Sequence, residues 1–174
     1  ALPVYLRSVL GWSFWEVGSF LAVWVIGYGI VQASAPRILG GRHPDGRMAT
    51  LLAFGLATLP AAIAVALTSG ADPTITLVVG LIVFGAVFAL NSAVHSFLIL
   101  NYADGDKVAM NVGFYYTANA VGRLAGTILS GVIYQLSGLE ACLWASALML
   151  VGAGVVSLRL PTVAGRSASA GALV

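Results

Sequence analysis

One stretch decides the fold: residues 111–138 read NVGFYYTANAVGRLAGTILSGVIYQLSG. The stretch is long enough to cross a bilayer as a helix, which takes about 20 residues. At about 100° per residue, its polar and small side chains fall within an arc of about 120°. These residues are Tyr115, Tyr116, Asn119, Arg123, Gly126, Thr127, Ser130 and Tyr134. The opposite side is apolar and consists of Val121, Leu124, Ala125, Ile128 and Val132.

Arg123 stands near the middle of this stretch. A charged side chain at the centre of a bilayer costs at least ~2.5 kcal/mol, so it is retained where it faces protein or water, and it marks a functional site. We therefore expect this helix to form one wall of a polar passage.

The composition indicates that lipid is the solvent for most of the chain. Of its 174 residues, 60% are hydrophobic and only 8% are charged, whereas a soluble domain carries about 25% charged residues. The single cysteine, Cys142, excludes an internal disulfide and a multi-thiolate metal site. Since no nucleophile–base–acid set, metal-ligand cluster or phosphate-cradling glycine loop can be assembled, we expect no enzyme activity, no cofactor and no nucleic-acid partner.

The hydrophobic runs predict an all-α, polytopic membrane protein with five complete spans and the end of a sixth. Residues 11–16, GWSFWE, are interpreted as an interfacial turn, and Pro36 as the end of the first complete span. One transmembrane domain would cover 1–161, and a disordered cytoplasmic tail 162–174. The expected spans are 1–7 (partial), 17–35, 48–68, 74–100, 108–136 and 139–160.

The charges between the spans predict the orientation. Basic residues cluster on one side: Arg37, Arg42, Arg47, Lys107, Arg159 and Arg166. The other side has a single basic residue among its charged residues: Arg7, Glu16, Asp72 and Glu140. By the positive-inside rule the first side is cytoplasmic, so the C-terminus is inside and the protein is a multi-pass protein of the inner (plasma) membrane.

Arg123 and Asn119 lie one turn apart on the same face and are the first candidate site residues. A guanidinium forms bidentate, charge-assisted hydrogen bonds with phosphate-like and carboxylate oxyanions. The alternative is a structural arginine that is bonded to backbone carbonyls of a neighbouring helix. Because no carboxylate lies at a similar depth in the five spans, the positive charge is available for a bound anion or for a partner on missing chain.

Asn91 and His95 are a second pair, one turn apart on the span 74–100. The histidine could titrate or donate a hydrogen bond to an anion, or it could be neutral and bonded to a neighbouring helix. We expect the pair to line a cavity rather than to transfer protons.

The remaining spans have few polar features. Trp24, Tyr28 and Gln32 recur every fourth residue in the first complete span, as a second cavity wall or as packing. The spans 48–68 and 139–160 are almost uniformly apolar, which favours outer, lipid-facing helices.

Several segments resemble a known family. The loop APRILGGRHPDGR (35–47) resembles the basic loop between the second and third helices of each half of a major facilitator superfamily transporter. More specific similarity, to ArsJ-type organoarsenical efflux permeases, lies in three segments. They are GWSFWEVGSFLAVWVIGYGIVQASAPR (11–37), VFALNSAVHSFLILNYADGDKVAMNVGFYYTANAVGRLAGTILSGVIYQLSG (87–138) and LEACLWASAL (139–148).

The resemblance implies that the spans are helices seven to twelve of a twelve-helix carrier, whose N-terminal half is a partner. Helices seven and ten of that fold line the central cavity, eight and eleven face the other half, and nine and twelve lie outside. The implied activity is alternating-access efflux of 1-arseno-3-phosphoglycerate, which confers arsenate resistance. Glyceraldehyde-3-phosphate dehydrogenase makes this substrate when it uses arsenate, so a functional link to that enzyme is also implied.

On this interpretation Arg123 anchors an anionic end of the substrate. The groups that orient the rest are Asn119, Tyr115 or Tyr116, Asn91 and His95. Two alternatives stay open: a major facilitator efflux pump for other small molecules or drugs, and a non-transporting membrane scaffold.

Overall fold

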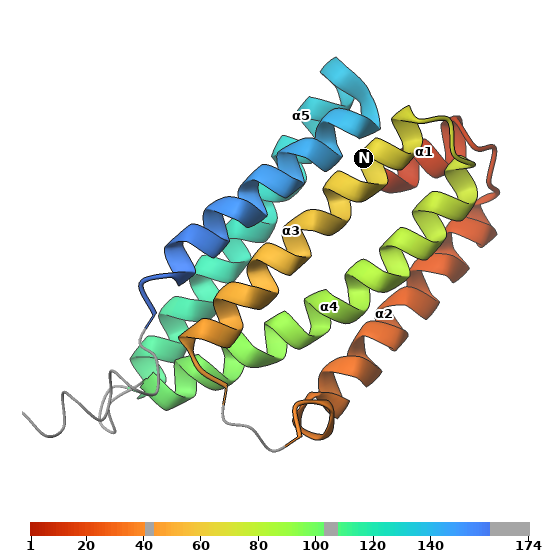
Figure 1. Ribbon diagram of the computed structural model, residues 1–174. Coiled ribbons are helices and arrows are strands. Elements are labelled where there is room, and N and C mark those ends of the chain that lie inside the picture. The colour runs from red at the N-terminus through yellow and green to blue at the C-terminus, as the bar shows by residue number, and fades with distance from the viewer. Residues whose placement is uncertain (41–43, 103–107, 161–174) are drawn as a thin grey trace, which may run out of the picture.

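The computed structural model describes residues 1–40, 44–102 and 108–160, and this part of the chain is helical. Four helices are long and apolar enough to cross a membrane, which confirms the predicted all-α, polytopic class. The elements, shown in Figure 1, are α1 (Leu2–Ser8), α2 (Phe14–Ile38), α3 (Gly46–Thr68), α4 (Pro73–Tyr102) and α5 (Val108–Ser157).

The helix α5 is interrupted at Gly138, where the backbone has φ 78° and ψ −171°. An unbroken helix of its 50 residues would be about 75 Å long, more than twice the thickness of the hydrocarbon core. The chain instead reverses at Gly138, so that residues 108–137 (the first segment of α5) and 139–157 (the second segment) run side by side in opposite directions (Figure 1).

The helices pack in the order α5, α3, α4 and α2 (Figure 1). Between its two neighbours α3 buries small and branched side chains, including Ala53, Leu56 and Ala64. The sequence predicts this span as a lipid-facing helix, yet α3 has the largest buried share of the four candidate spans. Small residues explain the difference, because they let membrane helices approach closely.

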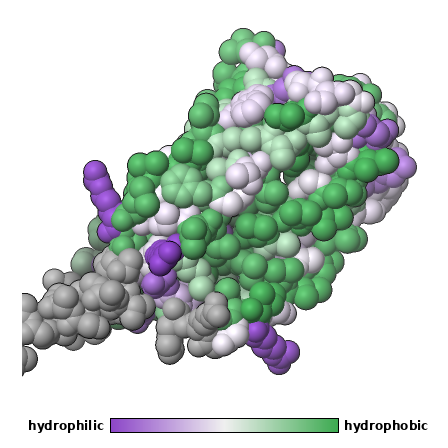
Figure 2. All heavy atoms as spheres, viewed as in Figure 1, coloured by the Kyte–Doolittle hydropathy of each residue, from purple (hydrophilic) through white to green (hydrophobic). Residues whose placement is uncertain are grey.

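Two clusters of buried side chains hold the bundle, one toward each end. The larger, the Leu6 cluster, joins every helix and consists of Leu6, Val17, Ile63, Leu77 and Leu139. The smaller, the Val94 cluster, joins α3 to α4 and consists of Ala49, Val94 and Leu98. Figure 2 shows mostly apolar residues over the middle of the helices and hydrophilic ones mainly toward the ends, the pattern of a surface in contact with lipid.

Local hydrogen bonds set the beginning of α2. Ser13 Oγ accepts from the backbone N–H of Glu16 at 3.2 Å, and the Glu16 carboxylate accepts from the backbone N–H of Ser13 at 2.7 Å. This capping box starts the helix at Phe14, inside the predicted interfacial turn 11–16. Nor does Pro36 end α2, which continues to Ile38, because a proline this close to the C-terminus disturbs only the last turn.

Apart from Arg123, the described charged residues lie at or near the ends of the helical segments. Arg37 in the last turn of α2 and Arg47 in the first turn of α3 flank one short connection. Arg159 follows the second segment of α5, where its neighbour Leu160 packs against the Val94 cluster. The structure does not describe the other basic residues expected on this side, Arg42, Lys107 and Arg166, or the predicted tail 162–174.

Candidate functional site

Arg123 lies midway along the first segment of α5, and its side chain is exposed. Together with Tyr116, Asn119 and Ala120 it lines an open hollow of about 460 Å³. The guanidinium has no hydrogen bond or ion pair with the described part of the chain. The backbone carbonyl of Arg123 accepts from Thr127 Oγ1 at 2.8 Å, a bond within the helix that leaves the charged end free.

Tyr115 and Tyr116 lie about two turns before Arg123 on the same helix. Their rings lie edge to face, with centroids 5.5 Å apart and planes at 68°. Tyr115 is partly buried, whereas Tyr116 is exposed and reaches the hollow. Of the two tyrosines that the sequence leaves as alternatives, Tyr116 is therefore the one beside Arg123.

The surroundings of Arg123 are open on every side. Residues 116–129 are all exposed, so the apolar face with Val121 and Leu124 is as uncovered as the polar face. A methyl group built at Gly122 or Gly126 would meet no atom within 4 Å. This part of α5 is therefore available for contact with lipid or with protein from outside the described residues.

Asn91 and His95 lie in the second half of α4, and both are partly buried. His95 Nδ1 is 2.9 Å from the backbone carbonyl oxygen of Asn91. Since a carbonyl only accepts, Nδ1 is the donor in this contact, and Nε2 is the ring nitrogen left for another partner. The side-chain oxygen of Asn91 is buried and has no hydrogen-bond partner among the residues that the structure describes. A buried acceptor left unpaired costs about 1–3 kcal/mol, so this oxygen is suited to a donor from a ligand or from water.

The structure therefore brings together some of the predicted site residues and not others. Tyr116, Asn119 and Arg123 share one hollow. Asn91 and His95 share a different helix and do not belong to its described lining.

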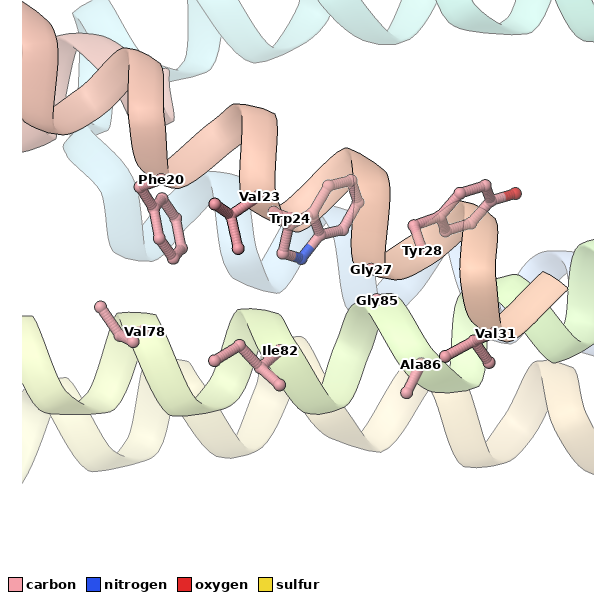
Figure 3. A pocket seen from close by; sticks show the side chains of 10 residues that line it. All are labelled: Phe20, Val23, Trp24, Gly27, Tyr28, Val31, Val78, Ile82, Gly85 and Ala86. Atoms are coloured by element: carbon pink, nitrogen blue, oxygen red, sulfur yellow. The ribbon is translucent and has the colours of Figure 1, made fainter. Parts of the chain in front are cut away.

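A second pocket, of about 320 Å³, lies between α2 and α4 (Figure 3). Trp24 and Tyr28 line this pocket, as expected if their spacing marks a second cavity wall. Gln32 is not among its lining residues. Sequence reasoning missed Gly85 on the facing helix, although a glycine inside an apolar run indicates a close approach. The complete lining is apolar and aromatic: Phe20, Val23, Trp24, Gly27, Tyr28, Val31, Val78, Ile82, Gly85 and Ala86.

A family model described as Major Facilitator Superfamily matches residues 1–172. No curated protein and no solved structure matches the chain. The match spans all five described helices and both candidate pockets.

Proposed function

The chain belongs to the major facilitator superfamily, whose members are transporters, and on this premise we propose that it is the C-terminal half of a carrier that exports an organic oxyanion. The N-terminal half of the same carrier would supply the other side of the binding site, because such sites lie at the interface of the two halves.

The observation that carries this proposal is the unpaired Arg123 guanidinium. It lies in the middle of an apolar span with no ion pair among the described residues. A charge at this depth is retained where it faces protein or water. An anionic substrate between the two halves would provide the missing negative charge, and the neighbouring Asn119 amide and Tyr116 hydroxyl would add hydrogen bonds.

The orphan oxygen of Asn91 supports a substrate with hydroxyl groups. This oxygen has no donor in the described part of the chain, and His95 Nε2 offers a second polar group one turn away. A substrate with anionic groups for Arg123 and hydroxyl groups for α4 would satisfy both sets of residues.

We propose 1-arseno-3-phosphoglycerate as that substrate, on the strength of the resemblance described above. It combines arsenate, phosphate and hydroxyl groups, which are hard oxygen ligands. Trivalent arsenic would instead require several thiolates. Cys142 is the only cysteine, and its buried thiol donates to the Ser130 carbonyl oxygen, with a sulfur–oxygen distance of 3.4 Å.

In the cell, glyceraldehyde-3-phosphate dehydrogenase would supply this substrate, and its export would confer arsenate resistance. We place the carrier in the inner (plasma) membrane with the C-terminus in the cytoplasm. A membrane potential that is negative inside favours expulsion of an anion by ~2.3 kcal/mol per charge per 100 mV.

The test is replacement of Arg123 by alanine and by lysine in the full-length carrier. Everted vesicles are given arsenate, glyceraldehyde 3-phosphate, NAD and the dehydrogenase, and uptake of arsenic is measured. Loss of a charge-assisted contact costs about 1.5–3 kcal/mol, so Arg123→Ala should lower uptake more than tenfold. Arg123→Lys keeps the charge but not the bidentate geometry, so its uptake of arsenic should lie between that of Arg123→Ala and that of wild type.

Arg159→Ala is the matched control, because it removes an arginine that follows the last helix. It should transport like wild type. Wild-type uptake by Arg123→Ala at equal expression would rule out the oxyanion site.

A second candidate function, export of apolar drugs, is favoured by the apolar pocket between α2 and α4. This function predicts that Arg123→Ala is tolerated and that lipophilic cations leave the cell. If cells that carry Arg123→Ala keep wild-type resistance to lipophilic cations, export of apolar drugs is favoured over export of an oxyanion.

A further inference from the structure

Trp24 connects two of the membrane-spanning helices. Its indole N–H, on α2, donates to the backbone carbonyl of Leu81, on α4, with a nitrogen–oxygen distance of 2.6 Å. In a hydrocarbon environment few other acceptors are available to an indole N–H. The bond therefore fixes both the distance and the register between α2 and α4 at this point.

Gly85 makes this contact possible. A methyl group at position 85 would lie 2.8 Å from Nε1, 2.9 Å from Cε2 and 3.0 Å from Cζ2 of Trp24. Real side chains do not approach this closely, and the indole is rigid. The ring could retreat only by lengthening its hydrogen bond to Leu81.

Stacked aromatic rings extend the contact toward the C-terminal end of both helices. Tyr28 stacks on Trp24, with centroids 6.0 Å apart and planes at 20°. It also contacts Phe88 of α4 at 5.6 Å. Figure 3 shows Trp24 on α2 with its indole nitrogen toward α4, and Gly85 on the side of α4 that faces α2.

The two candidate site residues of α4 come after Gly85 on the same helix. At 1.5 Å per residue, Asn91 lies about 9 Å and His95 about 15 Å along the helix from Gly85. Because a helix is stiff over such a distance, a change in the register or rotation of α4 at Gly85 is transmitted to both side chains.

We propose that Trp24 and Gly85 are positioning residues, whose contact holds α2 and α4 as one unit and sets the orientation of the Asn91–His95 face. Neither residue needs to touch the substrate. The role in transport rests on the proposed function, whereas the effect on the helices does not.

The first experiment measures the position of the α4 face without transport. The reporter is Asn91→Cys in a full-length background whose native cysteines, Cys142 included, are replaced by serine, and the readout is its rate of modification by a small, charged thiol reagent in vesicles. Adding Gly85→Ala or Trp24→Phe should change this rate at least threefold. Gly29→Ala is the matched control, because a methyl group there meets no atom within 4 Å, and it should leave the rate unchanged.

Both substitutions act on the same contact from opposite sides. Gly85→Ala displaces the ring, and Trp24→Phe removes the N–H while keeping an aromatic ring. We therefore expect the double variant to change the rate no more than the stronger single variant does. Unchanged rates in both single variants, or additive effects in the double variant, would overturn the proposal.

The second experiment measures transport by the same variants without the reporter. A positioning role predicts a KM raised at least threefold with a maximal rate within twofold of wild type, and no change for Gly29→Ala. A wild-type KM in both Trp24→Phe and Gly85→Ala would overturn the role in transport. If wild-type carrier moves no arsenylated triose, the proposed function fails, and the modification rates still decide whether the contact positions α4.

Discussion

Replacing Gly138 by alanine tests the turn that divides α5. The backbone there has φ 78° and ψ −171°, a region that is nearly restricted to glycine and costs other residues about 1–3 kcal/mol. A methyl group would meet no atom within 4 Å, so no clash adds to this cost. Straightening into one helix would relieve it, but that helix would be far too long for the bilayer and would withdraw Leu139 from the Leu6 cluster. We expect the turn to persist and the free energy of unfolding to fall by about 1–3 kcal/mol.

Gly131→Ala is the matched control. A methyl group there also meets nothing within 4 Å, but Gly131 lies inside the first segment of α5 with ordinary helical backbone angles. Alanine should stabilise this position by about 0.5–1 kcal/mol. The two variants of the full-length protein, unfolded reversibly in mixed micelles, should therefore differ by about 1.5–4 kcal/mol. Equal stability of Gly138→Ala and Gly131→Ala would refute this account of the turn.

Three further predictions concern the described helices and their orientation. Ser13→Ala removes the cap of α2 and should cost about 0.5–2 kcal/mol in the same unfolding assay; an unchanged unfolding free energy would show that the cap contributes nothing. Gly154→Leu should lower the free energy of unfolding by about 1–3 kcal/mol, because even a methyl group there would lie 2.9 Å from the Phe54 ring. Adding Phe54→Ala should recover part of the loss. The same cost of Gly154→Leu in both backgrounds would contradict the contact. Arg159→Cys, in a Cys142→Ser background, should react with an impermeant thiol reagent only after cells are permeabilised, whereas labelling of intact cells would reverse the predicted orientation.

The helical class follows from the sequence because hydrocarbon offers no partners to backbone N–H and C=O groups. Long apolar runs must therefore form helices, and turn residues such as Gly138 mark where they end. The expected span begins at residue 17, whereas α2 begins at Phe14. The sequence contains a signal for the earlier start, since Ser13 and Glu16 have the spacing of a capping box.

Burial was the harder property to predict. In water an apolar face indicates the core, but in a bilayer apolar side chains suit lipid and protein interior equally well. The apolar sequence of α3 therefore favours a lipid-facing helix, although Leu56 and Ala64 are fully buried in the bundle.

The candidate site was partly accessible to sequence reasoning. Helical periodicity places Asn119 and Arg123 on one face, and the structure puts both in one hollow. Periodicity contains no information about the register between helices, so the contact of Trp24 with Gly85 could not be predicted.

The uneven distribution of the two clusters has a mechanical consequence. The Leu6 cluster draws a buried side chain from each of the five helices, whereas the buried residues of the Val94 cluster come from α3 and α4 alone. Tilting of α2 away from α4 therefore leaves the buried residues of the Val94 cluster together, whereas the same motion at the other end separates Val17 from the Leu6 cluster. We expect the bundle to splay most readily at the end that carries Arg37, Arg47 and Arg159, with its pivot at the opposite end.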